Sequence, residues 1–407
     1  MNRARIALFL ASRAASTLGD QMLMFAVPLI VYRATGSVSM SGLAFLCEWL
    51  PRVISLPLAG VLADRVGGAR VYVVADSVRA VACLLAAWTL TLAPQQAFAV
   101  TALLMALCAF CYAQAFIALE ATVPLLVSKA DMPKAQSTLQ GINYGAGVAG
   151  PALAGVLMLW LAPAQLLWAA AVVFALSACG VRALRAARRI DTEARRESVL
   201  AGLATGWRVL RDTPLLVALV GLSLAVNLVV GLALATGAAI TVGRFGLPDQ
   251  AYASLQMSVG VLSIASFLLV PWLLRRCSVY RLGVFAFVVI ALGGLVMGLA
   301  HSYPVFVAGY ALSFALCGLF NVFIRTERLH WIPQAQLGRA IGLIVLLNQL
   351  SLPLAGLLVS VVGDRVPVQQ LYLAVATVAL VTFVVLRRFL QRHSRTALPP
   401  DLAPKAA

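Results

Sequence analysis

The chain has 407 residues, of which 62% are hydrophobic and only 11% are charged. A soluble globular domain has an apolar fraction nearer about 45–50%, so this composition excludes one and predicts an integral membrane protein. The formal net charge of +17 would suit a nucleic-acid-binding protein, but the basic residues flank apolar stretches and do not cover one soluble face. We therefore expect a phospholipid bilayer as the partner, and no nucleic acid.

Apolar stretches long enough to cross a bilayer as helices recur along the whole sequence. We predict an all-α membrane fold with about twelve transmembrane helices. The first stretch is too long for a signal peptide, so we expect it to be retained as a span. The predicted spans are 5–32, 38–63, 71–92, 96–119, 138–161, 164–186, 214–238, 251–274, 281–300, 304–325, 338–362 and 367–390.

The Lys and Arg residues between these spans are unevenly distributed. If both termini are cytoplasmic, the inner loops hold most of them, including the run from Arg182 to Arg211, whereas the outer loops hold little beyond Arg33, Arg244 and Arg365. The positive-inside rule therefore predicts that both termini face the cytoplasm.

The longest polar interval divides the chain into halves of similar size. We predict an N-terminal six-helix half over 1–186, a cytoplasmic linker over 187–213, a C-terminal six-helix half over 214–390 and a cytoplasmic tail over 391–407. Within the linker, apolar residues at near-helical spacing, such as Leu203 and Trp207, lie among arginines. This pattern fits either an amphipathic helix on the inner leaflet or a solvated connector.

A weak internal repeat relates the two halves. The first half contains Pro133, Gly141 and then Pro151 with Gly155; the second contains Pro333, Gly342 and then Pro353 with Gly356. Repeated halves with a substrate site at their interface are a recurrent design of transporters.

A charged, glycine-rich turn joins the second and third predicted spans. It runs from Gly60 to Arg70 and has the spacing Gly-x-x-x-Asp-Arg-x-Gly. Glycines permit tight backbone geometry, Asp64 can face the positive end of a helix, and basic residues can lie at a phospholipid surface. The turn resembles the signature loop of the major facilitator superfamily, except that Gly68 and Ala69 stand where the family usually carries basic residues. The resemblance implies two pseudo-symmetric six-helix halves and a cytoplasmic latch.

We expect this latch to extend to an acidic and a basic residue on the third span and to the inner end of the fourth. Asp76 and Arg79 have i,i+3 spacing and can pair. The expected counterpart of Asp64 is the N-terminus of the eleventh span near Gly338 and Arg339, because unpaired N–H groups attract an anion. The predicted inner-gate residues are Gly60, Asp64, Arg65, Gly67, Arg70, Asp76, Arg79 and Glu120.

Ionisable residues within a membrane span are costly and point to function or to a structural bond. Asp20 lies in a polar stripe of the first span, and Arg13, seven residues earlier, is too far along the helix for a local pair. Asp20 therefore needs a partner on another helix, or a proton. A role in proton coupling and a purely structural interhelical bond both remain open.

The second predicted span carries Glu48 and Arg52 at i,i+4, an order in which the two side chains can neutralise each other, with Trp49 beside them. The interior of the second half offers only uncharged polar groups, so a coupling proton is expected in the first half, on Asp20 or next on Glu48. The predicted proton-coupling and cargo residues are Asp20, Glu48, Arg52, Trp49, Arg13, Asn227, Gln256, Asn321, Asn348 and Gln349.

The fifth predicted span contains Gly150, Pro151 and Gly155, a pattern that permits close helix packing and bends the helix. It resembles the glycine-proline motif of drug-exporting antiporters, although ordinary packing explains it equally well. Together with Leu18-Gly19-Asp20-Gln21 and the segment from Ala75 to Ala80, it looks like the bacterial exporter subgroup that includes the enterobactin exporter. That resemblance implies a bacterial inner-membrane protein, acting as a monomer, that exports a siderophore-like or drug-like molecule by proton antiport.

Two alternatives stay open. One is an importer of a small organic solute, because the direction of transport cannot be deduced from helices. The other is a membrane lipid-modifying enzyme, but we find no nucleotide-binding loop, metal-spaced cluster or catalytic set around His301, His330 and His393. Cys108 and Cys111 form a Cys-x-x-Cys without further ligands, so we interpret them as packing residues. We expect no enzyme activity, no cofactor and no metal.

Overall fold

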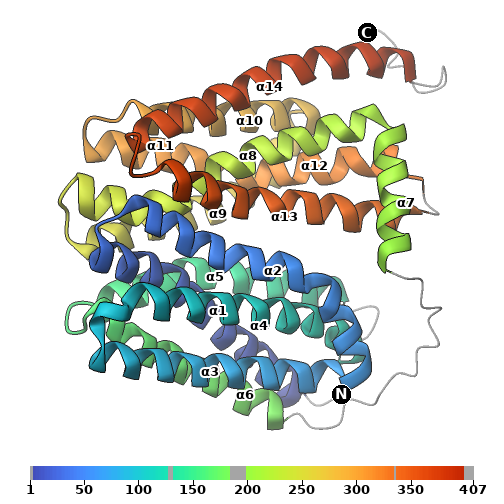
Figure 1. The fold of residues 1–407 in the computed structure, drawn as a ribbon. Helices are drawn as coiled ribbons and strands as arrows, with labels where there is room; N and C mark the ends of the chain where they lie inside the picture. Colours follow the sequence, from blue (N-terminus) through green and yellow to red (C-terminus); the bar gives the residue numbers. More distant parts are fainter. Residues whose placement is uncertain (1–2, 127–131, 184–198, 334–335, 398–407) are drawn as a thin grey trace. The chain divides into compact units, whose positions relative to one another are not determined.

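A computed structural model describes residues 3–126, 132–183, 199–333 and 336–397, and within these ranges the chain is helical without a strand (Figure 1). The α-helices are α1 (Arg3–Thr35), α2 (Val38–Val66), α3 (Gly68–Leu92), α4 (Ala97–Leu126), α5 (Met132–Leu157), α6 (Leu166–Ala183), α7 (Val199–Asp212), α8 (Pro214–Ala238), α9 (Asp249–Leu274), α10 (Val279–Gly298), α11 (Tyr303–Ala315), α12 (Cys317–Trp331), α13 (Leu337–Val362) and α14 (Val368–Ala397). Short helical turns η1 (Pro94–Gln96), η2 (Pro163–Gln165) and η3 (Ala239–Arg244) extend α4, α6 and α8.

Eleven of the described helical segments are long and apolar enough to cross a membrane. They correspond to the predicted spans with one exception, the fifth. Its helix α5 forms, but it carries polar residues such as Lys134, Gln140 and Asn143 and is not one of the eleven segments. An all-helical membrane fold with about twelve spans is thereby confirmed.

The tenth predicted span, 304–325, is not one continuous helix. The helix α11 ends at Ala315, and α12 begins at Cys317 after Leu316, whose backbone has φ −104° and ψ 7°. The two pieces together make a membrane-length segment from Tyr303 to Trp331. Hydropathy alone does not reveal such a break, because the residues next to it, such as Phe314, Leu319 and Phe320, are apolar.

The chain packs as two compact units, each considered by itself. Unit 1 contains Met1–Arg195, Gly231–Ala265 and Leu352–Pro367; unit 2 contains Arg196–Val230, Ser266–Ser351 and Val368–Ala407. The predicted boundaries of the two six-helix halves, at residues 186 and 214, stay predictions.

In unit 1, α1 packs against α4, α5 and α6, while α3 packs against α4 and α6 (Figure 1). Buried apolar residues of these helices form one core, in which Tyr72 is 1% exposed. Cys108 and Cys111 are free thiols buried in α4, as expected for packing residues. The outward faces are also apolar: Trp88 and Leu103 are 59% and 72% exposed. Exposed apolar side chains of this size suit contact with lipid chains.

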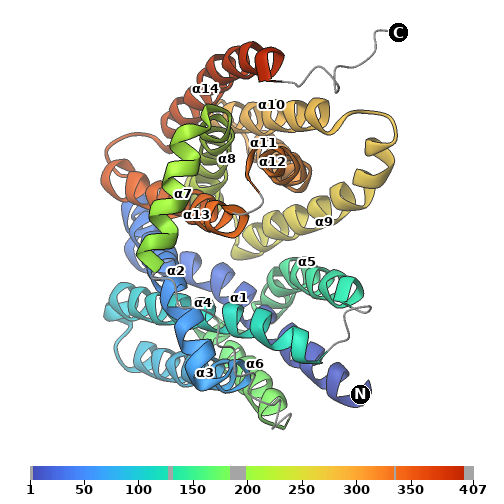
Figure 2. The same cartoon turned by 90° about the vertical axis from the view of Figure 1, so that its right-hand side faces the viewer.

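In unit 2, α10 packs against α11, α12 and α14 (Figure 2). Phe287 of α10 stacks on Phe383 of α14 with ring centroids 5.0 Å apart. The helix α7 adds Leu210 to the same core and leaves Trp207 exposed. The described part of the predicted linker is therefore an amphipathic helix, and its residues 187–198 lie outside the described residues.

Two polar contacts in unit 1 join segments far apart in the sequence. Arg33, at the end of α1, pairs with Asp249 at the start of α9 at 2.6 Å. Asp364, between α13 and α14, accepts hydrogen bonds from Ser37 Oγ at 2.5 Å and from the Val38 N–H at 2.8 Å, and so caps α2. Partial burial raises the pKa of Asp364, but hydrogen bonds from Ser37, Ser39 and Val38 outweigh it and lower this pKa below its ordinary value.

Candidate functional site

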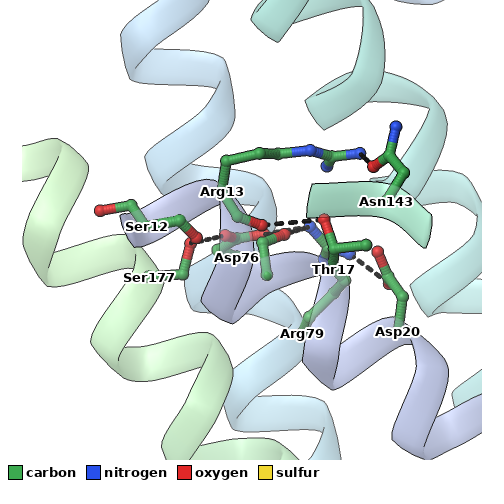
Figure 3. Close-up of polar contacts among 9 residues, drawn as sticks. Ser12, Arg13, Thr17, Asp20, Asp76, Arg79, Asn143 and Ser177 are labelled. Carbon is green, nitrogen blue, oxygen red and sulfur yellow. Dashed lines mark hydrogen bonds and ion pairs between the residues drawn. The ribbon is translucent and has the colours of Figure 1, made fainter. Parts of the chain in front are cut away.

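A fully buried guanidinium lies at the centre of the charged residues of unit 1. Arg79 of α3 donates from Nη1 to Asp20 Oδ1 of α1 at 2.6 Å and from Nη2 to Ser16 Oγ at 3.1 Å, and it also pairs with Asp76 (Figure 3). The Phe174 ring of α6 covers one side, 4.5 Å from Arg79 Cζ. A charge removed from water must be paired and hydrogen-bonded, and these contacts do so at Nη1 and Nη2, whereas the buried Nε has no partner.

Asp76 is the better satisfied of the two carboxylates. Ser177 Oγ of α6 lies 2.5 Å from Asp76 Oδ2, and Ser16 Oγ lies 3.3 Å from Asp76 Oδ1 (Figure 3). Asp20 has Arg79 on Oδ1, while its buried Oδ2 has no hydrogen-bond partner. Two carboxylates therefore share one guanidinium, and Asp20 Oδ2 is left without a hydrogen-bond partner.

Arg13 does not belong to this ion-pair cluster, in agreement with its predicted distance from Asp20. Its side chain is 2% exposed and donates from Nη2 to Asn143 Oδ1 of α5 at 3.0 Å (Figure 3). It therefore joins α1 to α5.

The predicted pairing of Asp76 with Arg79 is confirmed, and so is the expectation that Asp20 has a partner on another helix. The sequence had assigned Asp20 to one group and Asp76 with Arg79 to another, and the structure brings all three together. Ser177, Asn143 and Phe174 were missed, because no local spacing connects α5 and α6 to these charges. Ser16 was detectable, since it lies one helical turn before Asp20.

A second buried polar cluster lies on α2 and α4. Glu48 and Arg52 have a spacing at which they can neutralise each other, but no ion pair between them forms among the described residues. The Arg52 guanidinium lies instead between two rings, with its Cζ 4.3 Å from the centroid of Trp49 and 3.8 Å from that of Tyr112. Aromatic faces attract cations, so both rings stabilise the guanidinium.

The uncharged candidates of the second half fall into separate places. In unit 2, Asn227 Nδ2 donates to the Asn348 carbonyl oxygen at 3.1 Å, and the buried Asn348 Oδ1 has no partner. Asn321 is exposed, and Gln349 is half-buried. In unit 1, Gln256 Nε2 donates to the Tyr252 hydroxyl at 3.1 Å, and the Tyr252 ring stacks on Phe25.

The glycine-rich turn has the backbone that its sequence predicts. Gly67 ends α2 with φ +93°, a conformation that other residues rarely adopt. A Cβ on Gly68 would lie 2.7 Å from the Ala118 carbonyl oxygen of α4, so glycine permits close packing there. Arg65 and Arg70 are exposed. Gly60 and the side chains of Asp64 and Glu120 lie outside the described set, so their gate role stays a prediction.

The glycine-proline motif of α5 permits close packing, as predicted. Gly150 lies against Gln21 of α1, and a Cβ on Gly155 would come within 2.8 Å of the Ala253 Cβ. Pro151 lies inside the helix. Gly141, Gly145 and Gly147 have open space beside them, so packing does not require them to be glycine.

A protein whose described residues include eleven helical segments of membrane length and a buried charge cluster belongs to the class of multi-pass membrane proteins. Residues 9–326 match the Major Facilitator Superfamily, and the chain belongs to that superfamily.

The chain is similar to a multidrug efflux pump, Tap, of Mycolicibacterium fortuitum. The two are 26% identical over 211 residues, which make up 49% of this chain and 50% of that protein. The chain thus spans about half the length of the relative that it matches.

Solved structures show the same fold. The nucleoside transporter NupG has a TM-score of 0.76 at 15% identity, covering 95% of this chain and 99% of that one. A bacterial homologue of the iron transporter ferroportin, in an inward-facing state, has a TM-score of 0.73 at 19% identity with the same coverage.

Proposed function

We propose that the protein is a secondary active exporter of a siderophore-like or drug-like organic molecule, driven by protons entering in exchange. The observation that carries this proposal is the shared guanidinium of Arg79, which faces Asp20 and Asp76 while Asp20 Oδ2 has no partner. Because Oδ2 makes no hydrogen bond, a proton can bind to it without breaking one.

Protonation of Asp20 neutralises the charge that holds it to Arg79. The guanidinium then remains with Asp76, which Ser16 and Ser177 orient. The link between α1 and α3 weakens, and α1 becomes free to shift against its neighbours as the binding site changes its side of access. Asp20 is the proton carrier in this scheme, and Arg79 is the group that senses its charge.

Cargo is proposed to bind at Glu48, Trp49 and Arg52 of unit 1. Export is favoured by the similarity to an efflux pump. Import of a small organic solute is the alternative, since the NupG neighbour is a nucleoside transporter. A lipid-modifying enzyme is the alternative from a different class. We further propose a bacterial inner-membrane location, cytoplasmic termini and a monomeric state.

The test compares wild type with Asp20→Asn in proteoliposomes that carry an imposed pH gradient. Ligands are first found by thermal stabilisation of the purified protein, with iron-free and iron-loaded siderophores and cationic dyes as the screened compounds. We expect Asp20→Asn to bind the selected compound but to lose gradient-driven flux, because asparagine cannot exchange a proton.

The matched control is Asp212→Asn, which removes an exposed carboxylate at the end of α7 and should transport like wild type. Undiminished gradient-driven flux in Asp20→Asn would remove this residue from coupling. Flux of wild type that ignores the pH gradient would instead reject proton coupling altogether.

A further inference from the structure

The rings of Trp49 and Tyr112 contact the Arg52 guanidinium, but its N–H donors make no hydrogen bond among the described residues. Trp49 and Tyr112 cover its faces, at 4.3 Å and 3.8 Å from Cζ, whereas the N–H donors of an arginine point outward in the guanidinium plane. No hydrogen bond from the Arg52 side chain is present among the described residues, and its buried Nε has no partner. The residue is 8% exposed, and Nε is the guanidinium nitrogen that is both buried and without an acceptor.

Other polar atoms beside Arg52 are unsatisfied as well. The buried Glu48 Oε1 and the indole Nε1 of Trp49 have no hydrogen-bond partner. On α4, Gln114 is 3% exposed, and its Oε1 is also without a partner. A folded protein satisfies nearly all its buried polar groups, so these atoms of α2 and α4 are places where another molecule can supply the partners.

Glu48 and Arg52 lie one helical turn apart, but no hydrogen bond or ion pair joins them among the described residues. Buried polar groups without hydrogen-bond partners are costly. A ligand that brings a carboxylate to Arg52 and an ammonium or hydroxyl donor to Glu48 would satisfy both residues. A planar guanidinium held in place binds a carboxylate through two parallel hydrogen bonds, which adds geometric selectivity.

We propose that Glu48, Trp49, Arg52 and Tyr112 form a subsite for a zwitterionic, aromatic amino-acid-like group of the cargo. This inference rests on the proposed transport function and assigns the chemistry of its cargo. The rings supply the apolar body of the subsite: Phe45 lies beside Trp49, with ring centroids 6.0 Å apart. The subsite is closed in this structure, because Glu48 is only 4% exposed, and a ligand enters when the helices rearrange.

The test uses three compounds that share one phenylalkyl body. They are 2-amino-4-phenylbutanoate, which carries both charges, 4-phenylbutanoate, which carries only the carboxylate, and 4-phenylbutylamine, which carries only the ammonium. Dissociation constants are taken from thermal-shift titrations of the purified full-length protein. We expect the zwitterion to bind at least about 10-fold more tightly than either single-charge compound, since each charge adds a charge-assisted hydrogen bond.

Variants assign each charge to its partner. In Arg52→Gln, the zwitterion should bind no better than the amine; in Glu48→Gln, it should bind no better than the carboxylate. Tyr112→Leu removes one ring and should also weaken carboxylate binding, which provides a second route if Arg52→Gln does not fold. Arg33→Gln removes an exposed arginine elsewhere in unit 1 and should leave all three constants unchanged.

Failure of all three compounds to bind, or a zwitterion no tighter than its single-charge relatives, would overturn the proposed subsite. A carboxylate preference that survives in both Arg52→Gln and Tyr112→Leu would do so too. These outcomes are separate from the coupling test, because binding needs no pH gradient. Wild type that binds the zwitterion without proton-driven flux would retain the subsite and reject only the transport mechanism.

Discussion

Arg79 is the residue on which the buried charges of the first unit depend. It is fully buried, and both Asp20 and Asp76 rely on it for their charge compensation. The number of partners differs between the two carboxylates: Asp76 also receives two serine hydroxyls, whereas Asp20 Oδ2 receives none. This asymmetry assigns the mobile proton to Asp20 in the proposed mechanism and a fixed, orienting role to Asp76.

Replacing Arg79 should therefore be severe. We expect Arg79→Gln to destabilise the protein by about 3–5 kcal/mol, because it leaves two buried carboxylates without their cation. Thermal unfolding of the purified protein and the yield of monodisperse material measure the effect. Adding Asp20→Asn to Arg79→Gln should recover part of the loss, since one uncompensated charge is removed.

The control for this prediction is Arg33→Gln, which breaks a pair whose arginine side chain is 52% exposed. Because Arg33 is half in water, its loss should cost clearly less than the loss of the fully buried Arg79, even though its partner Asp249 is only 13% exposed. Equal losses in Arg79→Gln and Arg33→Gln would contradict the central role given to Arg79.

Residue spacing predicted some of these contacts and misjudged others. The i,i+3 pair of Asp76 and Arg79 forms as expected. At i,i+4, no ion pair joins Glu48 and Arg52 among the described residues, and the guanidinium contacts the ring of Tyr112, sixty residues further along the chain. Spacing along one helix shows which side chains can meet. It does not show which side chain of a neighbouring helix will offer a better contact.

At the level of elements, the sequence predicts some helix ends and helix contacts but not others. The backbone of Gly67 and the close approach of Gly150 to α1 follow from glycines that the sequence displays. The cap of α2 by Asp364 could not be predicted, because more than three hundred residues separate the acid from the Ser37 and Val38 groups that it accepts from. A single acidic residue in a loop carries no sign of the helix end that it will face.

The Asp364 cap should give the protein a characteristic acid sensitivity. Its hydrogen bonds to α2 hold the pKa of Asp364 below the ordinary value of 3.8. A depressed pKa contributes stability above the unfolded value, and this contribution disappears as the pH falls through the lower, folded value. We expect Asp364→Asn to melt below wild type at about pH 5 and above, with the gap narrowing as the pH falls below about 4.

Thermal melts of both proteins across this pH range test the prediction. Asp212→Asn serves as the control, because its carboxylate is exposed at the end of α7. A gap between Asp364→Asn and wild type that stays constant down to about pH 3 would show that the carboxylate charge does not stabilise the cap.

For the whole molecule, the distribution of basic residues predicts which side of the membrane each connection faces, and labelling can measure this. Cys277 is exposed in the connection between α9 and α10, beside Arg275 and Arg276, and should face the cytoplasm. His301 and Ser302, between α10 and α11, are exposed in the next connection and should face the opposite side.

A variant that retains only Cys277 should react with a membrane-impermeant thiol reagent in inside-out vesicles and remain unreactive in intact cells. A variant with Ser302→Cys as its only cysteine should show the reverse pattern. Labelling of both positions from the same side would reject the predicted orientation. If Cys277 reacts only in intact cells, the protein has the opposite orientation to the predicted one.

The sequence by itself determined the membrane class, the positions of nearly all the spans and the superfamily, because hydropathy and a short loop motif are local properties of the chain. Only the tertiary structure decided the break at Leu316, the sharing of Arg79 by two carboxylates and the stacking of Arg52 between two rings. The physical reason is the same for the two arginines. A buried charge takes the partners that helix packing brings to it, and those partners come from helices that are distant in the sequence.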